Sequence, residues 1–167
     1  MTRFATFAVL VSLLALTGCK KAPPDDKALA QGEWEIAAVD VPDETDKNEQ
    51  KEAEKLKDVT VVVQGDRVTI SHAKERGGVT ATFTLDPTKS PREIDITDAT
   101  VTGGGGAGEP EAIPGTTRGI YSITGDELVI ALPLGDGKNL PRPTEFKPLA
   151  DKVNHRGVLV FHLKKRK

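Results

Sequence analysis

The chain has 167 residues, with 23 Lys and Arg against 25 Asp and Glu, and a formal net charge of −2 at pH 7. That length is enough for one domain with a substantial core. A charge balance so near neutral does not provide the basic face that binds nucleic acid, so we expect no nucleic-acid partner. The one cysteine, Cys19, excludes an intrachain disulfide.

The N-terminus predicts a bacterial lipoprotein signal. Arg3 precedes an apolar run over residues 4–16, and Leu16-Thr17-Gly18-Cys19 follows. The run is too short to span a bilayer comfortably, which favours a processed signal over a transmembrane helix. We therefore predict a signal peptide over residues 1–18, a lipidated Cys19 with a tether over 19–27, and a barrel domain over 28–167. The alternative is an ordinary secretion signal with an incidental cysteine.

The same segment predicts where the protein resides. Two or three acyl chains on Cys19 would hold it at a membrane permanently, because a single chain binds only reversibly. Lys20 follows the cysteine, where an aspartate would retain a lipoprotein at the inner membrane in bacteria that sort by this position. We expect a lipid-anchored protein of the cell envelope, in the outer membrane and facing the periplasm or the cell surface.

The rest of the chain alternates apolar and polar residues with a period of two, which is typical of half-buried strands. A one-turn helix capped by Asp25 or Asp26 precedes the first strand. Gly65-Asp66 and Gly125-Asp126 each predict a tight hairpin turn. The expected strands cover residues 34–41, 59–64, 67–71, 79–85, 93–97, 119–124, 127–132 and 157–163. The pattern predicts an all-β, antiparallel barrel of about eight strands, because closure removes exposed strand edges.

Three segments interrupt the alternation. Residues 43–58 are dense in Glu, Lys and Asp and predict a solvated loop or a short helix. Residues 102–115 are rich in glycine and predict a loop. They lack the Gly-Lys-Ser/Thr ending of a phosphate-binding loop, so no nucleotide site is expected there. Residues 135–148 form a third irregular stretch.

Few residues point to catalysis. His72, His155 and His162 include no pair at metal-ligand spacing, and no serine lies in a Gly-x-Ser-x-Gly sequence. We expect no enzymatic activity, no cofactor and no metal.

Several motifs together carry a family resemblance. Gly32-Glu33-Trp34 resembles the opening of the lipocalins, in which the Trp closes one end of the barrel. The complete set of motifs is 29–34, 85–95, 119–121, 125–128 and 142–146. In this order they resemble a domain family without established activity that is expanded in planctomycete bacteria, often as lipoproteins. The resemblance covers about residues 28–165 and implies a lipocalin-like all-β fold. Residues 43–58 and 102–115 are longer than is typical of that family.

Four residues are candidates for ligand binding: Trp34, Tyr121, Arg142 and Phe146. Tyr121 has an apolar ring and a polar tip, which suits a barrel rim. Arg142 and Phe146 place a forked donor and an aromatic ring in one loop, a combination that could bind a carboxylate or a sugar at the barrel mouth. Alternatively, Arg142 pairs with Asp95 to lock the loop, and Phe146 plugs the barrel end.

The sequence thus predicts a membrane-anchored, non-enzymatic, lipocalin-like module that binds a small apolar or amphipathic ligand. The alternative is an interaction or scaffold module of the envelope, which binds a protein through its long loops while its barrel is filled. An open lumen of several hundred Å³ would favour the ligand carrier, and a packed interior would favour the second hypothesis.

Overall fold

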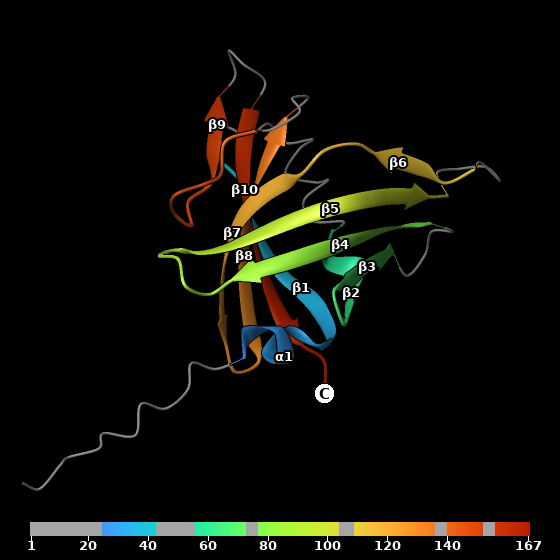
Figure 1. Ribbon diagram of the computed structural model, residues 1–167, viewed down its shortest axis with the longest axis horizontal. Coiled ribbons are helices and arrows are strands. Elements are labelled where there is room, and N and C mark those ends of the chain that lie inside the picture. The colour runs from blue at the N-terminus through green and yellow to red at the C-terminus, as the bar shows by residue number, and fades with distance from the viewer. Residues whose placement is uncertain (1–24, 43–55, 73–76, 104–108, 136–139, 152–155) are drawn as a thin grey trace, which may run out of the picture.

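The computed structural model describes residues 25–42, 56–72, 77–103, 109–135, 140–151 and 156–167 (Figure 1). The predicted signal peptide, Cys19 and most of the tether lie outside the described residues. So do His155 and parts of the three irregular segments.

The described chain is almost entirely strand. A short helix, α1 (Asp26–Ala30), precedes the first strand, and a 3-10 turn (Leu56–Asp58) precedes the second. The strands are β1 (Gly32–Asp40), β2 (Val59–Gln64), β3 (Arg67–His72), β4 (Gly78–Asp86), β5 (Arg92–Thr102), β6 (Glu111–Ile113), β7 (Thr117–Thr124), β8 (Glu127–Gly135), β9 (Leu149–Asp151) and β10 (Arg156–Lys165). All eight predicted strands are present, within a few residues of their expected bounds.

Eight of these strands close into an antiparallel barrel. The sheet runs β1-β2-β3-β4-β5-β7-β8-β10, and β10 pairs with β1 to close it. The predicted all-β, eight-stranded antiparallel barrel is therefore confirmed. The structure adds two short strands that the periodicity did not predict: β6 pairs with β5, and β9 pairs with β10. Each lies in or directly after a segment predicted to be irregular, and three residues are too few to show alternation.

The strand pattern places one face of each strand inside the barrel. Val59, Val61 and Val63 on β2 are buried while Thr60 and Val62 between them face outward, as a period of two requires. A second, smaller apolar cluster lies on the outer face of β7, β8 and β10. Its members Ile120, Ala131 and Val160 are at most 1% exposed and stand in one cross-strand row.

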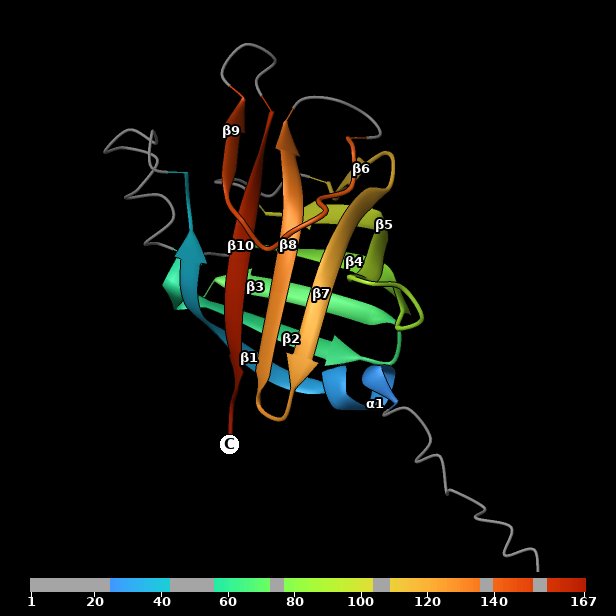
Figure 2. The same cartoon turned by 90° about the vertical axis from the view of Figure 1, so that its left-hand side faces the viewer.

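The meander gives the barrel two different ends. Helix α1, the turn at Gly65 and the turn at Asp126 gather at one end with the C-terminus, as both views show (Figures 1 and 2). Gln31 exchanges hydrogen bonds with the backbone of Gly65, and the Lys165 amide donates to the Asp126 carbonyl. We call this the α1 end. The longer connections, after β1, β3, β5 and β8, all leave from the opposite end, which we call the far end.

Candidate functional site

Helix α1 closes the barrel at the α1 end. The Asp25 carboxylate caps the helix by accepting from the Lys27 and Ala28 amides, and it is one of the two caps that the sequence offered. Trp34 is fully buried, and its indole Nε1 donates to the Ala30 carbonyl at 2.9 Å. The ring of Trp34 therefore holds the C-terminus of α1 over the interior.

The Gly-x-Trp sequence has a local physical reason. Gly32 has φ +116°, a conformation that L side chains rarely adopt, and a Cβ there would lie 3.1 Å from Lys165 Cε. Lys165 needs that space because its Nζ lies 5.2 Å from the centroid of the Trp34 ring and donates to the Leu29 carbonyl. Glycine at this position leaves room for the Lys165 side chain to reach the C-terminal end of α1.

A buried polar cluster joins α1 to the barrel wall. Asp26 is 3% exposed, and its Oδ2 accepts from the Tyr121 hydroxyl at 2.6 Å and from Arg92 Nη1 at 3.0 Å. Asp26 Oδ1 has no partner among the described residues. Burial, the hydrogen bond to Asp26 and the charge of Asp26 raise the pKa of Tyr121 well above its usual value. Tyr121 was expected to suit a barrel rim; it does lie at the α1 end, but it is only 2% exposed there because α1 covers it.

Sequence reasoning missed Asp26 as the partner of Tyr121, and Arg92 as the second partner of Asp26. The signal for Asp26 was available, because Asp26 and Ala30 are four residues apart and so share one helix face. Both are buried, which places that face toward the barrel. No local pattern linked Arg92 to the helix, because the contact joins residues 66 positions apart.

The barrel interior at the α1 end holds an apolar cavity of about 50 Å³. Its walls are Ala30, Val61, Val63, Val68, Phe83, Leu85, Ile94, Tyr121, Ile123, Leu128, Ile130 and Leu163. The wider empty space around it, about 490 Å³, includes open solvent and is therefore not the volume of the cavity itself. Small-molecule sites typically measure about 300–1,000 Å³. In the described residues the barrel is therefore largely filled.

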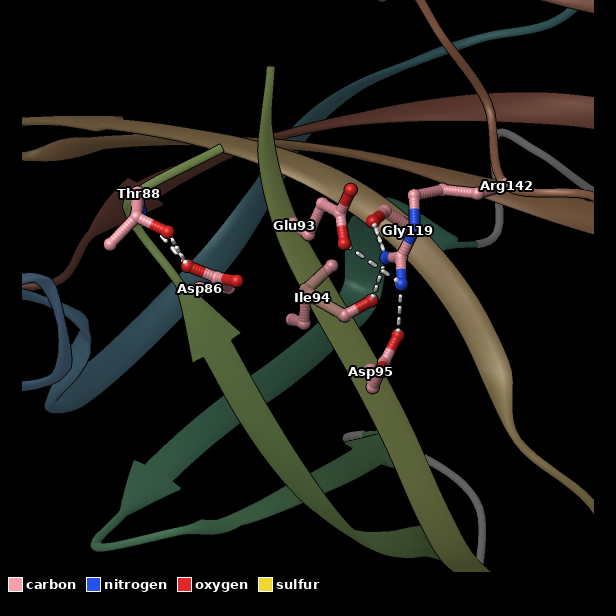
Figure 3. A network of polar contacts seen from close by, with 7 residues as sticks. All are labelled: Asp86, Thr88, Glu93, Ile94, Asp95, Gly119 and Arg142. Carbon is pink, nitrogen blue, oxygen red and sulfur yellow. Dashed lines mark hydrogen bonds and ion pairs between the residues drawn. The ribbon is translucent and has the colours of Figure 1, made fainter. Parts of the chain in front are cut away.

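Arg142 lies on the outside of the wall, where it bridges β5 and β7 (Figure 3). Its Nη1 donates to the carbonyls of Ile94 at 3.0 Å and Gly119 at 2.6 Å, two residues paired across the strands. Its Nη2 lies 2.7 Å from Asp95 Oδ1 and 3.3 Å from Glu93 Oε2. The structure thus forms the Arg142–Asp95 pair that the sequence offered as an alternative to ligand binding. The guanidinium of Arg142 already contacts two carbonyls and two carboxylates of the protein.

We call the contacts of Arg142 with β5 and β7 the clamp. Arg142 belongs to a segment over residues 140–148, the strap, which leads to β9. It passes across the outer face of β7, β8 and β10, which is the face that carries the second apolar cluster (Figure 2). Pro143 in the strap is buried, whereas Phe146 is 39% exposed. The expectation that Phe146 plugs the barrel end is therefore wrong, because its ring lies outside the wall.

The four sequence-predicted ligand residues do not converge. Trp34 and Tyr121 both point into the α1 end and belong to the same interior cluster. Arg142 is on the outer wall and Phe146 on the exposed side of the strap. Large exposed apolar side chains occur instead on β6, at the end of β8, in the strap and on β9: Ile113, Leu134, Phe146 and Leu149.

The described ranges also bear on metal binding and on membrane-spanning helices. No group of three or more His, Cys, Asp or Glu side chains is placed to hold a metal ion there. His162 instead lies 2.9 Å from Asp40 on the outer face. None of the described helices is long and apolar enough to cross a membrane.

Comparison of the chain with protein-family models, with curated proteins and with solved structures finds no match. The resemblance to the planctomycete domain family stays a prediction from the quoted motifs.

Proposed function

We propose that the protein is a lipid-anchored interaction module of the bacterial envelope that acts through the outer surface of a filled barrel. The observation that carries this proposal is the small interior cavity, about 50 Å³, together with its closure by α1. An interior of that size does not suit a carrier of drug-sized or lipid-sized molecules. The outer surface and the far end are then the parts available for binding.

The position of the anchor supports the same reading. The described chain begins at Asp25, directly before α1, and Cys19 lies six positions earlier in the sequence. Six residues reach at most about 20 Å, so lipidation of Cys19 would hold the α1 end near the bilayer. The far end, with Leu134 and Leu149 exposed, would then face away from the membrane. The two side chains lie beside the start of β10, opposite Gly157 and Val158, and so project from opposite faces of the sheet. Exposed apolar side chains of this kind can mark interaction sites.

Site-specific photo-crosslinking in living cells tests the proposal. A photoreactive amino acid replaces Leu134 or Leu149 at the far end of the full-length protein. The control position is the exposed Lys89, in the turn between β4 and β5, which lies at the α1 end because Arg92 at the start of β5 contacts Asp26 of α1. We expect discrete adducts of reproducible mass from the far-end positions and none from the position of Lys89. Adducts only at Lys89, or none at any position, would contradict the proposal.

A second candidate is carriage of a small apolar molecule, which is favoured by the purely apolar cavity wall. Native mass spectrometry of the protein isolated without added lipid separates the two. A bound mass that denaturation releases would support carriage, and a clean apo mass would support the filled barrel.

A further inference from the structure

Helix α1 covers the barrel interior without belonging to the sheet. It has five residues, which are too few for a helix to be stable alone in water, so its structure depends on contacts with the wall. Directly after it, Gly32 pairs with Val63 of β2 and is therefore fixed in the sheet. A movement of α1 relative to the wall must then pivot at Gln31, the residue between the helix and the first strand.

The C-terminal part of α1 is held by contacts in which both polar partners are satisfied. Trp34 Nε1 and Lys165 Nζ each donate to a carbonyl of the helix. The Gln31 side chain exchanges two hydrogen bonds with the backbone of Gly65. These contacts lie close to the pivot, so they restrain the C-terminal part of the helix and leave its N-terminal part to be held by other groups.

The N-terminal part of α1 is held in a different way. Within the described residues, its hydrogen bonds to the barrel wall all end on Asp26, whose Oδ2 accepts from Tyr121 and from Arg92. Asp26 Oδ1 is buried there without a partner. A carboxylate oxygen that is buried without a donor costs free energy, and hydration would return that free energy if the helix lifted. We call Asp26, Tyr121 and Arg92 the latch.

The latch lies beside the apolar cavity. Tyr121 forms part of the cavity wall, and Ala30 of α1 contributes another part of it. Asp26 and Ala30 are both buried and share one helix face, which points toward the barrel. The rest of the cavity wall belongs to strands that are paired in the closed sheet. Lifting Asp26 away from Tyr121 is therefore the movement that opens the cavity at the α1 end and leaves the barrel intact.

We propose that α1 is a lid, which pivots at Gln31 and opens when Asp26 leaves Tyr121 and Arg92. The closed state predominates, because the latch and the contacts near the pivot both favour it. The apolar wall and the volume of about 50 Å³ restrict what can enter to apolar molecules of a few heavy atoms. This inference goes beyond the proposed function and deepens the second candidate, carriage, because it names the route of entry. It does not depend on the lipid anchor.

Hydrogen exchange measures the opening in the full-length protein, solubilised in neutral detergent. The Leu29 amide donates to the Asp25 carbonyl inside α1, and this bond is lost when so short a helix leaves the wall. Arg92→Met removes the cation of the latch and leaves the buried carboxylate with one neutral donor. The matched control is Arg142→Met, which removes the same kind of side chain from the clamp on the outer wall. Nitration by tetranitromethane is the second readout, because an open lid uncovers Tyr121, the only tyrosine.

We expect Arg92→Met to speed exchange of the Leu29 amide by at least about tenfold. It should also speed nitration of Tyr121, whereas Arg142→Met should leave both rates close to those of the wild type. The exchange of α1 should depend only weakly on low concentrations of urea, because lifting a short helix exposes little surface. Equal rates in the two variants would overturn the proposal. A urea dependence as steep in α1 as in β10 would also overturn it, because α1 would then open only when the whole barrel unfolds.

A conservative variant and the wild type keep the test decisive. Arg92→Lys retains the positive charge and should restore slow exchange in α1, and exchange as fast as in Arg92→Met would count against the latch. If Arg92→Met does not fold, the urea dependence of the wild type decides alone, and a steep dependence overturns the lid. The photo-crosslinks at Leu134 and Leu149 test the proposed interaction function separately, because both positions lie at the far end.

Discussion

The two ends of the barrel are built by different means. At the α1 end, Trp34, Asp26 and Lys165 each contact the helix or fix it to the wall through a named hydrogen bond, and the apolar core is continuous beneath it. At the far end, two three-residue strands lie on the barrel edges, and Leu134 and Leu149 stay exposed. Among the described residues, the contacts that close the barrel are therefore concentrated at the α1 end, whereas the far end carries exposed apolar side chains.

The largest expected effect tests whether closure depends on the α1 end. Trp34→Ala removes a fully buried indole and the hydrogen bond to Ala30, so we expect a loss of about 4 kcal/mol in the free energy of unfolding. Leu134→Ala at the far end should cost less than about 1 kcal/mol, because its side chain is 45% exposed. Urea denaturation measures both, and equal losses would refute the asymmetry.

The next effect concerns the clamp between the strap and the wall. Arg142→Met removes four polar contacts and leaves the Ile94 and Gly119 carbonyls without this donor, which should cost about 2 kcal/mol. Hydrogen exchange should become faster in the strap and in β9, and stay slow in α1. Faster exchange throughout the chain would mean that the clamp supports the whole barrel.

The strands and the hairpins were predictable because their signals are local. The period-two alternation fixes which side chains enter the barrel, and Gly65-Asp66 and Gly125-Asp126 form the expected turns. The cap at Asp25 followed from the same kind of local reasoning. Strands β6 and β9 were not predictable, because they form only where β5 and β10 extend past their main partners.

The candidate site was less predictable, because its contacts join distant parts of the sequence. Arg142 and Phe146 are close in the chain, yet one is clamped to β5 and β7 and the other is exposed. Tyr121 was expected at the rim from its amphipathic side chain, but the buried Asp26 supplies a polar partner inside. Sequence patterns indicate which face of a strand is apolar, but not which polar group will meet a buried hydroxyl.

The pH dependence of stability tests the polar cluster of the α1 end. The folded state raises the pKa of Tyr121 above its unfolded value of about 10. The neutral phenol therefore favours folding fully below pH 10, and that contribution is lost as the pH rises further. Tyr121→Phe should cost about 2 kcal/mol at neutral pH, because a buried carboxylate loses a donor.

Above pH 10 the wild type should lose stability more steeply than Tyr121→Phe. The chain has a single tyrosine, so phenolate absorbance follows this residue alone. A phenolate that forms at the usual pH in the folded protein would show that the contact with Asp26 is absent in solution.

The smallest expected effect is at the far end. Leu149→Ser replaces an apolar side chain that is 59% exposed on a strand paired only at one edge in the described chain, so stability should change by less than about 0.5 kcal/mol. If the far end is an interaction surface, the same variant should nevertheless weaken its photo-crosslinks at Leu134, because both positions flank the start of β10. If Leu149→Ser weakens the photo-crosslinks but leaves the stability unchanged, the exposed side chain of Leu149 contributes to binding and not to folding. If Leu149→Ser unfolds the protein and Trp34→Ala does not, the far end and not the α1 end would be the one on which the stability of the barrel depends.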